Sequence, residues 1–263
     1  MTDKPNLVLI HGWGLNAAVW QPLLPKLEQV FNLYPLSIPG YGDHIDHHHS
    51  DDIDTLAKAL LDQAPPNAIW CGWSLGGMAA MAAASLSPDR IHSMVLLCTT
   101  PKFVLSEDWA AGTEFAHFQA FSDDLSAHYK KGLKRFLLLQ AGSLNDARNT
   151  AKKALGAIET YPSPSTTTLT AGLTILREAD LRARAKTLTP PCTVIAGKRD
   201  RVVSPKASQY LADMLPNGSF HALNSGHAPM LSHPDELATI LVNHASQHLD
   251  SRQCSASWQG SVS

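Results

Sequence analysis

The segment from residue 68 to residue 86, AIWCGWSLGGMAAMAAASL, restricts the fold of this chain more than any other part of it. It begins as the apolar run of a buried strand and continues as a run of small residues that suits a closely packed helix. Between the two lies Gly72-Trp73-Ser74-Leu75-Gly76, a Gly-x-Ser-x-Gly pattern. Glycines at such a junction let the backbone turn sharply and let the helix approach the sheet. The segment therefore predicts a strand, a tight turn that presents the Ser74 hydroxyl, and a helix.

Strand and helix patterns alternate on either side of this segment. Short apolar runs with turn residues at their ends predict strands, and runs with apolar residues three or four positions apart predict helices. Strands are expected within 6–12, 31–42, 91–100, 192–200 and 218–227, and helices within 52–63, 204–216 and 234–249. This order predicts an α/β fold, with a mostly parallel central sheet flanked by helices.

From about residue 105 to residue 180 the alternation stops and the patterns are helical. We expect residues 1–104 and 181–250 to form one α/β core, and residues 105–180 to form a helical insertion that covers the strand ends as a lid. Residues 251–263 show no periodicity and are expected to be disordered.

Composition narrows the class of protein. The 263 residues suffice for one large core, and 44% hydrophobic with 17% charged residues is ordinary for a soluble globular protein. The chain has no apolar run near the roughly 18 residues of a membrane span, and a strand pattern follows its first residues without a signal peptide. The four cysteines lack metal-ligand spacing. We therefore expect a cytoplasmic protein with buried free thiols and no membrane contact.

A serine hydroxyl becomes a good nucleophile when a histidine takes its proton and an acid orients that histidine. The chain order that goes with this type of serine turn is serine, acid, histidine. Asp200 and His227 each follow a predicted strand, and parallel strands bring their carboxyl ends to one edge of a sheet. We predict Ser74 as nucleophile, His227 as general base and Asp200 as its orienting acid. An acid from an earlier strand, and Ser74 as a simple helix cap, are the alternatives.

The oxyanion of such a reaction needs N–H donors. We expect one from Leu75, directly after the nucleophile, and the other from Trp13 in the His-Gly-Trp-Gly loop at 11–14. The Trp13 indole could also form a wall of the acyl pocket or simply pack in the core. The chemistry requires neither metal nor organic cofactor. For the histidines at 44 and 47–49, a solvated loop is favoured over a metal site.

Positive charge is concentrated in one part of a chain whose formal net charge is −2. Residues 128–153 contain seven Lys or Arg and one acid, Asp146. On a helix, Lys131 and Arg135 are one turn apart, as are Arg148 and Lys152. The sign bias favours a docking surface for an acidic partner over a merely solvated face. Nucleic acid is disfavoured, because the basic region is small and has few interleaved aromatic residues.

Five segments carry a resemblance to a known family: HGWGLNAAVW at 11–20, AIWCGWSLGG at 68–77, RFLLLQ at 135–140, AGLTILREADLR at 171–182 and GHAPMLSHPDEL at 226–237. With them the chain resembles the α/β-hydrolase superfamily over nearly its whole length, excluding the tail. Within that superfamily it is most similar to the pimeloyl-[acyl-carrier protein] methyl ester esterases of biotin synthesis. Tryptophans in both the first loop and the serine turn are unusual for generic hydrolases.

The resemblance implies a serine esterase that acts, without a cofactor, on the pimeloyl methyl ester carried by acyl carrier protein; we expect a monomer. It implies a substrate site lined by Trp13, Ser74, Leu75, Phe136, Leu137, Leu138, Leu139, Gln140 and His227, to which we add Phe103 at the start of the insertion. It also implies that Lys131, Arg135, Arg148 and Lys152 contact the acidic carrier protein. A generalist short-chain esterase, a C–C bond hydrolase and a binding protein on the same fold are the alternatives.

Overall fold

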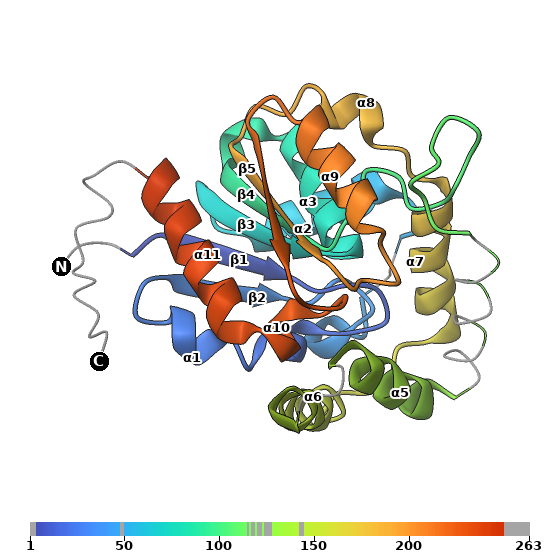
Figure 1. Ribbon diagram of the computed structural model, residues 1–263. Helices are drawn as coiled ribbons and strands as arrows, with labels where there is room; N and C mark the ends of the chain where they lie inside the picture. Colours follow the sequence, from blue (N-terminus) through green and yellow to red (C-terminus); the bar gives the residue numbers. More distant parts are fainter. Residues whose placement is uncertain are drawn as a thin grey trace.

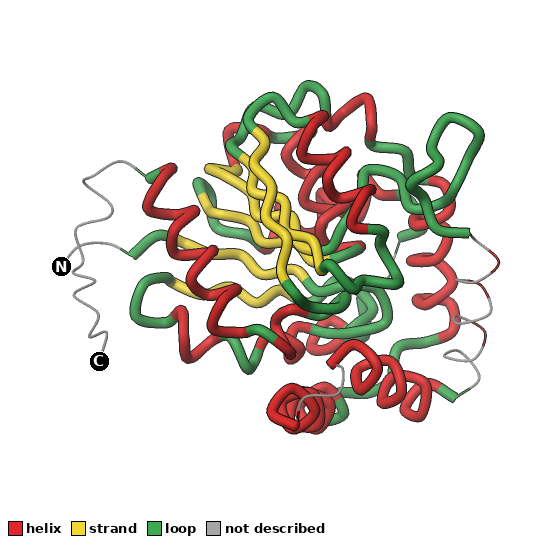
Figure 2. The backbone as a smooth tube through the Cα atoms, in the orientation of Figure 1, coloured by secondary structure: helices red, strands yellow, loops and turns green. Residues whose placement is uncertain are grey.

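A six-stranded parallel sheet forms the centre of the protein, in the order β2-β1-β3-β4-β5-β6. The computed structural model describes residues 4–47, 50–114, 116, 119, 123, 128–141 and 145–249. The strands are β1 (Asn6–Ile10), β2 (Asn32–Leu36), β3 (Ala68–Trp73), β4 (Ile91–Leu97), β5 (Cys192–Gly197) and β6 (Gly218–Leu223). Figure 2 shows them gathered between helices. The predicted α/β fold with a central parallel sheet is confirmed.

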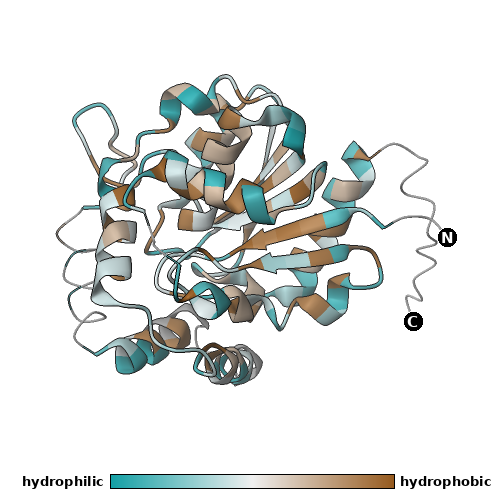
Figure 3. Ribbon diagram, turned by 180° about the vertical axis from the view of Figure 1, so that it is seen from behind, coloured by the Kyte–Doolittle hydropathy of each residue, from teal (hydrophilic) through white to brown (hydrophobic). Residues whose placement is uncertain are grey.

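Helices cover both faces of this sheet. Short α1 (Leu24–Leu27) contacts α11 (Pro234–His248), and α11 also contacts β4. A second series of contacts runs from α2 (Ile53–Gln63) to α3 (Leu75–Leu86), α8 (Arg182–Ala185) and α9 (Pro205–Met214). The remaining short elements are η1 (Ala17–Trp20), η2 (Gly42–His44), η3 (Pro88–Arg90) and α10 (Pro229–Ser232). The inner strands β1, β3, β4 and β5 are almost entirely buried, as the apolar runs predicted, and brown predominates in the middle of the sheet in Figure 3. The edge strands β2 and β6 are mostly exposed or half-buried.

The register of the strands brings their carboxyl ends together. Ile10 at the end of β1 lies opposite Gly72 of β3, and Trp73 lies opposite Leu97 at the end of β4. Leu97 in turn pairs with Ile195 of β5. The loops that follow these strands therefore begin side by side, which is the arrangement that a shared site requires.

The segment predicted as an insertion contains α5 (Tyr129–Ala141), α6 (Asn145–Ile158) and α7 (Thr166–Glu178). In Figure 1, α7 lies beyond the arrowheads of β1 and β2. α5 packs against α6, and α6 contacts η1 and α10. Both helices bury an apolar face, formed by Leu133 and Leu137 in α5 and by Ala151, Ala154, Leu155 and Ile158 in α6. The domain boundaries at 104 and 181 stay a prediction.

The start of this segment differs from the helical pattern expected from about residue 105. Residues 105–114 form turns with isolated bridges between Val104 and Thr113 and between Ser106 and Trp109. Trp109 donates its indole N–H to the Lys102 carbonyl oxygen at 2.9 Å, which fixes the turn. The helical prediction was wrong here because Trp109 hydrogen-bonds back to Lys102, a contact that hydrophobic periodicity does not reveal.

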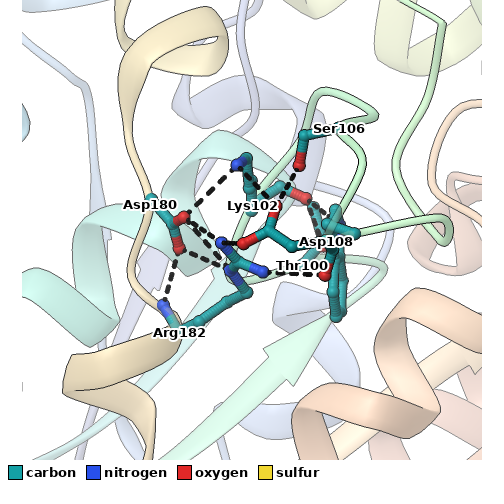
Figure 4. Close-up of polar contacts among 7 residues, drawn as sticks. Thr100, Lys102, Ser106, Asp108, Asp180 and Arg182 are labelled. Carbon is teal, nitrogen blue, oxygen red and sulfur yellow. Dashed lines mark hydrogen bonds and ion pairs between the residues drawn. The ribbon is translucent and has the colours of Figure 1, made fainter.

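Ion pairs join the two ends of the segment that is predicted as an insertion (Figure 4). Asp180 lies 3.4 Å from Lys102 Nζ and 2.6 Å from Arg182 Nη2, and Asp108 lies 2.7 Å from Arg182 Nη2. Hydrogen bonds from Ser106 and Arg182 lower the pKa of Asp108 to about 2. The Leu181 N–H also donates to the Pro101 carbonyl oxygen at 2.8 Å. These contacts hold the two ends of the segment predicted as an insertion next to each other.

Some predictions fall on parts of the chain that the structure does not describe. These are the tail at 251–263 with Cys254, His48 and His49, and the side chains of Phe136, Leu139 and Gln140. Cys71, Cys98 and Cys192 are free and buried, as predicted. In the part of the chain described, no helix is long and apolar enough to cross a membrane.

Candidate active site

Ser74 sits at the turn between β3 and α3 with φ 56° and ψ −119°, in a region that side-chain-bearing residues rarely occupy. Such a conformation costs on the order of 1–3 kcal/mol and persists only when its surroundings enforce it. A Cβ on Gly72 would lie 2.4 Å from the Gly76 carbonyl oxygen, and one on Gly76 would lie 2.5 Å from the Ile10 carbonyl oxygen. The glycines are thus required by contact between turn, helix and strand, as the sequence pattern predicted.

The segment after β4 braces this turn. The Ser74 N–H donates to the Leu97 carbonyl oxygen at 3.0 Å, and Thr99 Oγ1 donates to the Ser74 carbonyl oxygen at 2.7 Å. A Cβ on Gly77 would lie 2.6 Å from Thr99 Cγ2, so the Thr99 side chain fills the space beside the helix. Ser208 of α9 holds the Thr99 carbonyl oxygen at 2.8 Å. Sequence reasoning missed Thr99, because its contacts depend on the pairing of β3 with β4.

His227 and Asp200 form a buried hydrogen-bonded pair. His227 Nδ1 lies 2.7 Å from Asp200 Oδ2, and the two side chains are 2% and 1% exposed. Asp200 Oδ1 accepts from the Val202 and Val203 amides at 2.8 and 3.0 Å, which fixes the carboxylate. An ionised carboxylate can only accept hydrogen bonds, so in this pair the N–H of a neutral imidazole must be on His227 Nδ1. Nε2 is then the nitrogen able to accept a proton.

Trp73 connects this pair to the serine turn. Its indole N–H donates to the His227 carbonyl oxygen at 2.7 Å, and the Trp73 and His227 ring centroids are 5.4 Å apart. Trp73 directly precedes Ser74, so His227 is held against the residue beside the nucleophile candidate. The structure thus gathers Ser74, Asp200 and His227 from the ends of β3, β5 and β6 at one edge of the sheet. Their catalytic roles stay a prediction.

The residues predicted to supply the oxyanion donors, Leu75 and Trp13, lie in the two segments next to Ser74. Leu75 is the first residue of α3, so its N–H has no helical carbonyl one turn earlier to which it could donate. A Cβ on Gly12 would lie 3.3 Å from Ser74 Cβ, which places the loop containing Trp13 directly against the nucleophile candidate. The positive end of the α3 dipole faces the same point. This geometry fits the proposed donors.

Cys98, Asp200 and His227 offer ligand atoms within 4.8 Å of one another, as the single such group in the residues described. Burial, with the Asp200 charge as a second cause, raises the pKa of the Cys98 thiol well above its ordinary value. A protonated thiol is a poor metal ligand and a poor nucleophile. Cys98 follows β4 and has φ 46°, so its backbone is strained at a point next to Asp200.

A serine–histidine contact away from Ser74 lies between α11 and β4. His244 Nε2 is 2.9 Å from Ser93 Oγ, and its Nδ1 is 2.8 Å from Thr193 Oγ1. Burial lowers the pKa of His244 to about 3, with nearby His248 as a further cause. Both ring nitrogens are engaged and Ser93 is fully buried near the start of β4. This contact is structural, because no substrate could reach it.

The other predicted residues are placed as follows. Leu137 and Phe103 are buried and Leu138 is half-buried, whereas the docking candidates Lys131, Arg135, Arg148 and Lys152 are exposed on α5 and α6. The Trp13 indole N–H donates to the Leu169 carbonyl oxygen of α7 at 2.9 Å. Substrate contact and docking by these residues stay predictions.

Known proteins resemble this chain over most of its length. The profile of the Alpha/beta hydrolase family matches residues 7–240. Pimeloyl-[acyl-carrier protein] methyl ester esterase from Vibrio vulnificus (strain CMCP6) is 37% identical over 92% of this chain and 94% of its own. The protein of the same name from Pectobacterium atrosepticum is 38% identical over 91% of this chain and 94% of its own.

Solved structures with little sequence identity share the fold. The esterase EaEST from Exiguobacterium antarcticum has a TM-score of 0.80 at 19% identity and covers 94% of this chain and 93% of its own. Bromoperoxidase from Bacillus anthracis has a TM-score of 0.80 at 23% identity, with 93% and 92% covered.

Proposed function

Because the chain belongs to the alpha/beta hydrolase family, we propose that it is a serine carboxylesterase that hydrolyses the methyl ester of pimeloyl-[acyl-carrier protein]. The products are pimeloyl-[acyl-carrier protein], used in biotin synthesis, and methanol. The observation that carries the chemistry is the buried His227–Asp200 pair held by Trp73 beside the strained turn at Ser74. The substrate assignment is supported by relatives of that name at 37–38% identity over most of the chain.

In the proposed reaction, Ser74 Oγ attacks the ester carbonyl carbon while His227 Nε2 takes the hydroxyl proton. The N–H groups of Leu75 and Trp13 stabilise the resulting oxyanion, and Asp200 stabilises the imidazolium. The tetrahedral intermediate collapses, the C–O bond to the methoxy group breaks, and His227 passes the proton to departing methanol. Water then attacks the acyl-enzyme with His227 again as base, releasing the carboxylate and regenerating Ser74.

The carrier-protein part of the proposal is supported by the placement of charge. Lys131 and Arg135 of α5 and Arg148 and Lys152 of α6 are exposed, while the same helices bury apolar residues toward the core. An acidic protein could therefore dock on α5 and α6 without disturbing their packing. The proposal places the enzyme in the cytoplasm, in agreement with the buried free thiols that the structure describes.

Replacement of the nucleophile tests the enzymatic assignment. Ser74→Ala should lower kcat for p-nitrophenyl acetate and for the pimeloyl methyl ester by about 10⁶-fold and abolish labelling by a fluorophosphonate probe. Ser85→Ala, on the same helix, is the matched control and should keep both. A Ser74→Ala protein that is still labelled, or that turns over near the wild-type rate, excludes this nucleophile.

Charge reversal tests the carrier protein. The double variant Lys131→Glu, Arg135→Glu should lower kcat/KM for the carrier-bound ester by at least about tenfold at low salt, with a smaller loss at high salt. Hydrolysis of a small ester should be unchanged. Lys206→Glu, exposed on α9, is the control. Equal effects on both substrates would indicate a generalist esterase.

A further inference from the structure

Helices α5, α6 and α7 each hydrogen-bond to the loop that follows β1. Tyr129 Oη donates to the Gly14 carbonyl oxygen at 3.1 Å, Asn16 Nδ2 donates to that of Ile158 at 3.2 Å, and the Trp13 indole donates to that of Leu169 at 2.9 Å. These partners belong to α5, α6 and α7 respectively. The inserted segment therefore fixes the loop that carries a proposed oxyanion donor.

The Trp13 indole can lie against α7 because residue 172 of that helix is a glycine and has no side chain. A Cβ on Gly172 would lie 2.5 Å from Trp13 Cδ1 and 2.9 Å from Trp13 Nε1. Leu169, which accepts the indole hydrogen bond, is three residues earlier on the same face of α7. Glycine inside a helix is less favourable than alanine by about 0.5–1 kcal/mol, so the helix itself does not require glycine at 172; the close approach of Trp13 does. The Trp13 indole thus lies on bare helix backbone.

The Trp13 side chain has little room to retreat. It is 8% exposed, and a Cβ on Gly172 would also lie 3.5 Å from the hydroxyl of buried Tyr41. Relief of the contact from 2.5 Å to an ordinary 3.4 Å requires a shift of about 0.9 Å. A Cβ on Gly12, the next residue toward β1, would lie 3.2 Å from Trp73 Cε3 and 3.3 Å from Ser74 Cβ, so the loop has little free space on that side. A displaced indole therefore moves the Trp13 backbone, whose N–H is the proposed donor.

We propose that Gly172 is a positioning residue that seats the Trp13 indole on α7 and thereby aims the Trp13 backbone N–H at the oxyanion. This inference rests on the proposed function, since it assigns a task within that reaction. It also gives a physical role to the AGLTILREADLR segment, in which Gly172 is the residue next to Trp13. In this proposal Gly172 affects the position of the Trp13 backbone N–H and not the binding of the acyl chain.

The first test compares two glycine-to-alanine variants. In Gly172→Ala, kcat for p-nitrophenyl acetate should fall about 10- to 100-fold with KM changed less than about twofold, since a 1 Å misplacement in an active site costs up to about 10² in rate. Gly156→Ala on α6 is the matched control, because a Cβ there has nothing within 4 Å. It should leave kcat and KM at wild-type values. Equal kinetics for the two variants would overturn the inference.

A second test asks whether Gly172 acts through the indole. Trp13→Phe removes the indole N–H that donates to Leu169 and should lower kcat more than it raises KM. In the Trp13→Phe background, Gly172→Ala should cost less than about threefold, because residues that act through one contact are not additive. A full additional loss would overturn the inference, since it would indicate general damage to α7.

Trp13→Phe alone also decides the question if Gly172→Ala does not fold: an unchanged kcat would overturn the inference. Failure of the proposed function gives a different result. In that case wild-type protein hydrolyses no ester and is not labelled by the fluorophosphonate. Failure of the inference alone leaves wild-type hydrolysis intact.

Discussion

Asp200→Asn isolates the task of the buried carboxylate, because the structure dictates how the amide would orient. Asp200 Oδ1 accepts from two backbone amides, those of Val202 and Val203, while Oδ2 faces His227 Nδ1. An asparagine must keep its oxygen toward the two amides. The opposite orientation would leave buried N–H donors unpaired, at about 1–3 kcal/mol each. The asparagine NH₂ group therefore faces His227 Nδ1.

This orientation reverses the histidine tautomer. Nδ1 must now accept from the amide, so the ring proton moves to Nε2, which can no longer take the proton of Ser74. We expect kcat to fall about 10⁴-fold with the fold intact. At 1.36 kcal/mol for each factor of ten, the activation barrier rises by about 5 kcal/mol.

The assay is p-nitrophenyl acetate hydrolysis together with fluorophosphonate labelling, with thermal unfolding to check the fold. Asp213→Asn, an exposed carboxylate on α9 that accepts from Gln209 at 2.9 Å, is the matched control and should keep wild-type kcat. If a folded Asp200→Asn protein kept more than a tenth of wild-type kcat, the tautomer argument would be refuted. Another residue would then have to orient His227.

Two further predictions concern stability. Burial lowers the pKa of His244 from 6.5 to about 3. Between these two pH values this histidine binds a proton in the unfolded chain but not in the folded chain. The free energy of unfolding should fall by about 2 kcal/mol between pH 7 and pH 5. Urea unfolding should show that His244→Gln reduces this pH dependence and that Val242→Ala keeps it; equal pH dependence in all three proteins would contradict the reasoning. Asp180→Asn breaks ion pairs to Lys102 and Arg182 and should lower the free energy of unfolding by less than about 1 kcal/mol at low salt. This loss of stability should disappear in high salt, and a loss unaffected by salt would exclude an ionic origin.

The sequence was sufficient to locate the candidate triad, because each member is a local feature at the end of a strand. Gly-x-Ser-x-Gly marks the turn at Ser74, and Asp200 and His227 follow apolar runs. A parallel sheet then brings the three ends to one edge without any knowledge of long-range contacts. The 2.7 Å contact of His227 with Asp200 joins residues 27 positions apart in adjacent βα units.

The contacts that hold these residues could not be read in the same way. Trp73 and His227 are 154 positions apart, and Trp13 and Leu169 are 156 apart. Each depends on how a loop and a helix pack in three dimensions, and no periodic pattern encodes that packing. The error at residues 105–114 has the same origin, since the bond from Trp109 to the Lys102 carbonyl oxygen replaces the expected helix.

The tryptophans of the two loop motifs differ physically from those of the core. Trp20 and Trp70 are fully buried and, among the residues described, their indole N–H groups have no hydrogen-bond partner. These two contribute by packing, so phenylalanine at either position would lose volume and no hydrogen bond. Trp13 and Trp73 each donate to a backbone carbonyl oxygen of a distant segment. Phenylalanine at Trp73 would leave the buried His227 carbonyl oxygen without this donor, at about 1–3 kcal/mol. Hydrogen bonding to the main chain therefore explains why indole, and not just any large apolar ring, stands beside both the nucleophile and the oxyanion loop.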